Sequence, residues 1–126
     1  YREQTQNFEV AVEPEFLPEH SSIQHHQYVF SYRIRITNHG EKAAQLLSRH
    51  WIITDGQGKT HEVKGEGVVG EQPLIPPGES YEYSSFCPLT TPTGNMRGKY
   101  QMMNEQGETF QVKIPLFFLR DMRNLH

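Results

Sequence analysis

The fold is decided by the stretch QYVFSYRIRITN, which runs from Gln27 to Asn38. Large apolar side chains occupy every second position from Tyr28 to Ile36, and mostly smaller or charged side chains stand between them. A period of two is typical of a β-strand that has one face against a core and the other face in water. The sequence therefore predicts a half-buried strand over these residues.

Similar alternation occurs on both sides of this strand. Phe8, Val10 and Val12 share one face before Pro14, and because proline lacks the N–H group of a sheet ladder, we expect an edge strand with a bulge there. The turn residues at 55–58 (DGQG) predict a hairpin between the strands before and after them. One face of the first hairpin strand is expected to carry Leu47, Arg49, Trp51 and Ile53. Further strands are expected over residues 81–87, 96–104 and 109–118.

These strands are expected to form one all-β domain. The chain has 126 residues, a common size for a single domain, and glycine and proline recur too often for a long helix. About seven or eight antiparallel strands at short spacing are typical of an immunoglobulin-like or fibronectin type III-like sandwich. We therefore expect one sandwich over residues 1–126, with its ordered part from about residue 8 to about residue 119.

The composition narrows the classes of function. The net charge is −3, from 12 basic and 15 acidic residues, so the broad positive charge that attracts nucleic acid is missing. No stretch approaches the roughly 18 apolar residues of a membrane span. Cys87 is the only cysteine and can form no intrachain disulfide, which favours a reducing compartment, the cytoplasm. We expect neither a nucleic acid nor a membrane as the direct partner.

The segment GEGVVG, Gly65 to Gly70, has the glycine spacing of a dinucleotide-binding motif. That motif also needs a helix directly after the glycines, because the pyrophosphate binds to the free N–H groups of the first helical turn. Pro73, Pro76 and Pro77 follow instead, and their spacing excludes such a helix. The sequence predicts an inter-strand loop here, and no cofactor.

Three interpretations of this loop are open. In the first, the glycines take positive φ angles in a crossover between two sheets, and Val68 and Val69 fill one end of the core. In the second, successive N–H groups form a nest for a phosphate or carboxylate group, although Glu66 and Glu71 would repel an anion. In the third, the apolar residues 68–69 and 74–75 contact a partner protein.

Four runs in fixed order carry a resemblance to a known family. They are residues 48–55 (SRHWIITD), 63–73 (VKGEGVVGEQP), 77–79 (PGE) with 83–85 (YSS), and 94–100 (GNMRGKY). Together they resemble the bacterial ApaG family over nearly the whole chain. The resemblance implies a fibronectin type III-like sandwich, an association with cobalt tolerance and magnesium efflux, and no established enzymatic activity. Related domains in eukaryotic F-box proteins imply a role in protein interaction.

Arg49 is the most suggestive single residue. Its position on the apolar face predicts a cation that points inward, which is costly unless the cation is paired or stacked. We expect it to contact the main chain or to stack on Trp51 or a tyrosine. A role in binding an anion or a partner beside the glycine loop is the alternative.

Metal-binding and catalytic patterns are weak. If the hairpin pairs Thr54 with Lys59, then His61 lies opposite Ile52 and close to His50, but two ligands do not make a metal site. The adjacent His25 and His26 are typical of a surface loop. Cys87 continues an apolar face and is expected to be a buried structural thiol. The acidic residues are scattered singly. We predict no catalytic residue and no metal site.

Two functions remain. The first is a non-enzymatic module that binds a protein partner. The alternative is a sensor of a small ligand, either a phosphate-containing anion such as pyrophosphate or a divalent cation, bound through the glycine-rich loop. The candidate binding residues are the same for both: Gly65, Gly67, Val68, Val69, Gly70 and Arg49.

Overall fold

The computed structural model describes residues 1–122 and is built almost entirely of β-strands. In chain order the elements are β1 (Arg2–Thr5), β2 (Phe8–Phe16), a 3-10 turn (Pro18–His20), β3 (Tyr28–Asn38), β4 (Ala44–Asp55), β5 (Thr60–Glu66), β6 (Leu74–Ile75), β7 (Ser80–Leu89), β8 (Thr93–Asn104) and β9 (Thr109–Arg120). The predicted all-β fold is confirmed. Within the described chain, no helix has the length and apolar character that crossing a membrane requires.

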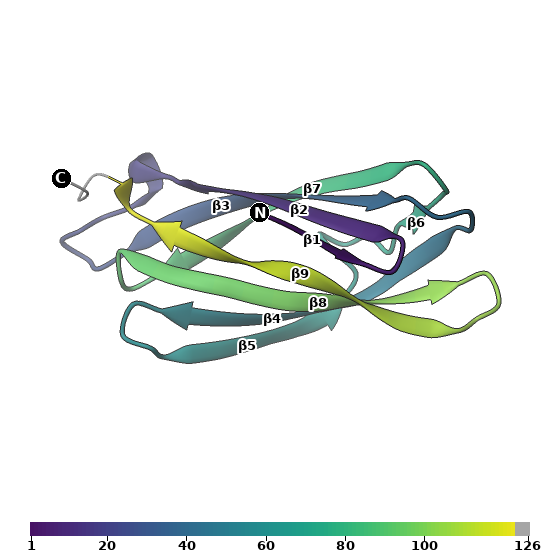
Figure 1. Ribbon diagram of the computed structural model, residues 1–126. Helices are drawn as coiled ribbons and strands as arrows, with labels where there is room; N and C mark the ends of the chain where they lie inside the picture. The colour runs from purple at the N-terminus through teal and green to yellow at the C-terminus, as the bar shows by residue number, and fades with distance from the viewer. Residues whose placement is uncertain (123–126) are drawn as a thin grey trace.

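The strands form two antiparallel sheets that lie face to face (Figure 1). Sheet 1 has the order β1-β2-β3-β7, and sheet 2 has the order β5-β4-β8-β9, with β6 also paired to β4. Along one side of the sandwich a hydrogen bond joins the two sheets: the N–H group of Lys113 in β9 donates to Oγ1 of Thr5 in β1 at 3.1 Å. At the other side β7 and β5 are the edge strands. This is the predicted sandwich.

The core lies between the sheets and is filled by alternate residues of each strand. On β3, the alternating residues from Tyr28 to Asn38 are all buried, as the sequence predicts for this stretch. Trp51 of β4 packs edge-on against Tyr32 and Phe117, with ring centroids 5.3 Å and 5.9 Å away. These contacts join the two sheets near the middle of the sandwich.

A β-bulge lies in a different strand from the one in which the sequence predicts it. β2 lies between β1 and β3, so the expected edge strand is wrong, although Pro14 itself lies beyond the residues of β2 that pair with β1. The expected bulge is also wrong, because the β2–β3 register runs through Pro14 without a shift. A register shift occurs instead between Leu46 and Ser48 of β4. Because of that shift Leu46 is fully buried, and the expectation that Leu47 shares the face of Arg49 is wrong.

A strand that the sequence did not predict precedes β2. β1 pairs along β2 from Arg2 to Thr5, before the predicted start at residue 8. The ring of Tyr1 also lies 6.1 Å from that of Phe117 in β9. This strand has few apolar residues, so hydrophobic periodicity does not reveal it.

Candidate functional site

The glycine-rich loop interrupts the edge of sheet 2. β5 pairs with residues 48–54 of β4, and β6 pairs with Ala44 and Gln45 of the same strand. β5 and β6 are therefore two parts of one edge strand, and the loop bulges out between them. The predicted inter-strand loop is confirmed. The expected crossover between sheets is wrong for these residues, because the chain changes sheet only after β6, on its way to β7.

The bulge in β4 holds the loop in place. The carbonyl oxygen of Leu47, the extra residue of that bulge, accepts hydrogen bonds from the N–H group of Gly67 at 2.8 Å and from Nε2 of Gln72 at 2.9 Å. The N–H group of Leu46 donates to the carbonyl of Pro73 at 2.9 Å. The two irregular segments therefore satisfy each other's backbone groups.

A tight turn forms the tip of the loop. Val68 and Glu71 exchange backbone hydrogen bonds of 2.8 and 3.0 Å across Val69 and Gly70. The φ angles of these two central residues are 48° and 79°, as a type I′ turn requires. Glycine adopts such angles freely, but for a β-branched residue a positive φ costs on the order of 1–3 kcal/mol. Val69 is therefore a strained residue.

The apolar side chains of the loop divide into two groups. Val68 and Ile75 are buried, with 0% and 1% of their surface exposed, whereas Val69 and Leu74 are 64% and 63% exposed. The prediction that Val68 fills part of the core is confirmed, and the same prediction for Val69 is wrong. The apolar surface that the loop presents to solvent consists of Val69 and Leu74.

Arg49 ties the loop to the sheet from the inner side. Its Nη1 donates to the carbonyl oxygens of Glu66 at 3.0 Å and Gly67 at 2.8 Å, so the expected main-chain contact is confirmed. Gly65 is the register partner of Arg49, and a Cβ atom there would lie 2.7 Å from Nη2 of Arg49. No stacking of Arg49 on a ring occurs within residues 1–122, where the cation–π contact joins Arg120 and Phe118.

Comparisons with known proteins show the family of this chain. A family model described as the ApaG domain (DUF525) matches residues 18–104, which include the loop and Arg49. The ApaG proteins of Afipia carboxidovorans and Bradyrhizobium diazoefficiens are 58% and 56% identical over 119 residues, 94% of this chain and 92% of theirs. The chain belongs to the ApaG family.

A solved structure shares the fold of this ApaG-family chain closely. The crystal structure of the putative ApaA protein from Bordetella pertussis superimposes with a TM-score of 0.89 at 50% sequence identity, and the match covers 98% of this chain and 97% of that one. The sandwich predicted from alternation and from the family resemblance is thus confirmed by a relative.

The charge of Arg49 acts on three tyrosines of the ApaG sandwich, Tyr32, Tyr83 and Tyr100. The hydroxyl groups of Tyr83 and Tyr100 lie 2.6 Å apart. Burial raises the pKa of Tyr100 well above its usual range, and the pKa of Tyr32 is raised for the same reason, while the charge of Arg49 acts in the opposite direction on both. The sequence placed Tyr83 on a strand but gave no sign of this cluster, because it joins four separate strands.

The candidate metal pair of the hairpin does not form. Thr54 pairs with Thr60 rather than with Lys59, so His61 lies opposite Ile53 and faces away from His50. Among residues 1–122, no group of three or more His, Cys, Asp or Glu side chains could hold a metal ion. His25 and His26 are exposed in a turn, as expected.

The backbone of the ApaG loop is also relevant to the proposed anion nest. The N–H groups of Gly67 and Val68 donate to the carbonyl oxygens of Leu47 and Glu71, so they do not point toward an outside anion. The geometry of these two amides does not favour the nest. Binding of a small ligand at the loop stays a prediction.

Proposed function

We propose that this ApaG-family chain is a non-enzymatic protein-interaction module whose contact surface is the glycine-rich loop with the edge strand formed by β5 and β6. One observation carries the proposal: Val69 is both strained and exposed. Its φ angle is 48° while 64% of its surface is in contact with solvent.

Folding alone gives no reason for a valine at this position. Asn or Gly would adopt the type I′ turn without the steric cost, and either would suit an exposed site better. Apolar residues that are kept exposed at the expense of stability are typical of surfaces that bind a partner. The exposed Leu74 lies on the same edge of the sheet and extends this surface.

The thiol of Cys87 also supports a non-enzymatic role. Its residue is 3% exposed, and burial raises the pKa of the thiol to about 11. A catalytic cysteine needs an accessible thiolate near neutral pH, which means a lowered pKa. A buried, unpaired cysteine also agrees with the cytoplasm as the compartment that we propose.

A site-specific crosslink tests the proposed contact surface. A photoreactive amino acid at Val69, activated in cells of the native host, is expected to form adducts with a defined protein, and an excess of wild-type protein should suppress them. The control position is Gln57, an exposed turn residue at the opposite end of β5. Equal adducts from both positions, or none from Val69, would contradict the proposal. The captured partner could then be tested for a role in cobalt tolerance and magnesium efflux.

A further inference from the structure

A row of basic side chains crosses the outer face of sheet 2. Lys64 of β5 is the register partner of His50 in β4, His50 is the partner of Lys99 in β8, and Lys99 is the partner of Lys113 in β9. Register partners project from the same face of a sheet. With neighbouring strands about 4.8 Å apart, the row is about 14 Å long. We call these four residues the basic row.

The three lysines of the basic row are not neutralised by neighbouring side chains, whereas His50 has a carboxylate beside it. Like charges directly opposite each other destabilise a sheet, and Lys99 and Lys113 are such a pair. Within residues 1–122 none of the three lysines takes part in an ion pair. Nε2 of His50 has no hydrogen-bond partner in that part of the chain, and the Glu62 carboxylate lies 3.6 Å from it.

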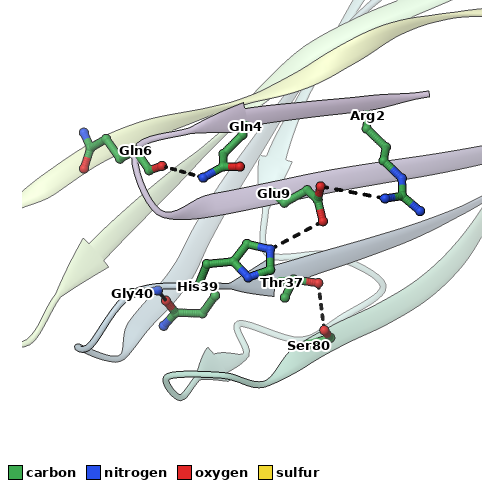
Figure 2. Close-up of polar contacts among 9 residues, drawn as sticks. Arg2, Gln4, Gln6, Glu9, Thr37, His39, Gly40 and Ser80 are labelled. Carbon is green, nitrogen blue, oxygen red and sulfur yellow. Dashed lines mark hydrogen bonds and ion pairs between the residues drawn. The ribbon is translucent and has the colours of Figure 1, made fainter.

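The outer face of sheet 1 is arranged in the opposite way. Its arginines face carboxylates, since Arg33 pairs with Glu13 and Arg35 pairs with Glu82 at 2.7 Å. Figure 2 shows the Glu9 carboxylate between the side chains of Arg2 and His39, at distances of 4.0 and 3.5 Å. The arginines of sheet 1 are therefore paired with carboxylates, whereas the three lysines of the basic row are not.

Two shallow hollows border the basic row. One has a volume of about 360 Å³ and the other about 290 Å³, and His50 and Lys99 line both. The first hollow also reaches Arg49 and Gly65, so the row adjoins the glycine-rich loop. No Phe, Tyr or Trp side chain lines either hollow. The apolar Ile52 and Leu116 line the second hollow.

We propose that the basic row binds an acidic segment of a partner protein in extended conformation. The inference rests on the proposed function, because it takes a protein as the partner and adds the chemistry of the bound segment. About five extended residues, at roughly 3.3 Å each, span the row and place carboxylates on alternate positions. Apolar residues between the carboxylates would find contacts at Ile52 and Leu116.

The surroundings of the row favour a peptide over a nucleic acid. Single-stranded nucleic acids are usually held by stacking on aromatic side chains in a long positive groove. Here no Phe, Tyr or Trp lines the hollows. Glu66 lines one hollow and Glu3 the other, and Glu62 lies 3.6 Å from His50, so these carboxylates would repel a polyanion. A short segment with few carboxylates would meet less of this repulsion than a polyanion.

Fluorescence anisotropy with a labelled peptide of alternating Glu and Leu residues tests the proposal. The full chain should bind this peptide at low ionic strength and should not bind the matching Gln–Leu peptide. In the double variant K99Q/K113Q the dissociation constant should rise about tenfold, as expected for two exposed ion pairs. The control variant R33Q/R35Q changes the net charge equally on sheet 1 and should alter the dissociation constant less than twofold.

Each other outcome decides against the basic row as a peptide site. These outcomes are equal binding of the Glu and Gln peptides, no binding of either, or equal weakening by the two double variants. Tighter binding of a single-stranded oligothymidylate than of the Glu peptide would assign the surface to nucleic acid and overturn the proposal. None of these results would alter the crosslink from Val69, so the two proposals fail separately.

Discussion

Val69 shows how a single residue connects the local conformation of this chain to its proposed role. Its side chain lies at the tip of a type I′ turn and does not pack into the core. Because that side chain is branched at Cβ, the positive φ angle strains the backbone of Val69. We predict that Val69→Asn raises the free energy of unfolding by about 1 kcal/mol, since Asn tolerates a positive φ angle. Urea unfolding at neutral pH measures the change.

The matched control for that substitution is Val63→Asn in β5. Val63 is 41% exposed and lies in an extended strand. Valine is favoured in strands, so the control should lower the free energy of unfolding by up to about 1 kcal/mol. If Val69→Asn also lowers the free energy of unfolding, as the control does, then the turn does not strain Val69.

A Cβ atom at Gly65 would stand within 2.7 Å of the guanidinium group of Arg49. Gly65→Ala should displace that group and lower the free energy of unfolding by about 1.5–3 kcal/mol, the range for hydrogen bonds of a charged group. In an Arg49→Met background the same substitution should cost much less. A double-mutant cycle from urea unfolding measures this coupling, and additive effects would contradict the assigned contact.

Cys87 gives a pH dependence with a defined sign. Burial raises the pKa of its thiol to about 11 from an ordinary value of 9.0, so the folded protein holds this proton more tightly than the unfolded chain does. The resulting stability is fully present below pH 9 and is lost as the pH rises through about 11.

The variant Cys87→Ala isolates that contribution. The difference in unfolding free energy between wild type and this variant should shrink by on the order of 1.4 kcal/mol per pH unit in this range. The buried tyrosines titrate in both proteins, so they cancel in the difference. A difference that does not change with pH would show that the thiol is not desolvated.

At the scale of elements, the alternation of side chains was sufficient to predict most strands but not their registers. The stretch from Gln27 to Asn38 forms β3 almost as expected, because one buried face requires a period of two. The predicted register of the hairpin was wrong by one residue. The turn is fixed by the Asp55 carboxylate, which accepts hydrogen bonds from the N–H groups of Gln57 and Lys59. Side-chain hydrogen bonds of that kind leave no periodic signal.

The basic row is an element-scale property with an effect on stability. Lys113 is exposed and directly opposite Lys99, so replacing it removes a repulsion between like charges with little loss of packing. Lys113→Gln should raise the free energy of unfolding by about 0.2–1 kcal/mol at low salt. The gain should fall in high salt, because exposed charges are screened. Arg35→Gln, which removes a paired cation, should show no such gain.

At the scale of the whole molecule, the sandwich could be predicted and the binding surface only in part. The candidate residues fall around one loop, as the glycine pattern indicates, but the sequence could not tell that Val68 is buried while Val69 is exposed. That division follows from the turn and from the bulge in β4, which depend on long-range hydrogen bonds. The basic row was missed because it joins four strands through their register.

The proposed role of the strained, apolar Val69 at the tip of the loop is to bind a partner protein. The most direct measurement is the affinity of the partner captured from Val69 for the wild type and for Val69→Asn, together with the stability of both proteins. We expect the variant to be more stable and to bind the partner at least about tenfold more weakly, as for an interface residue that contributes about 1.4 kcal/mol or more. Unchanged affinity in a variant that is more stable would contradict this role.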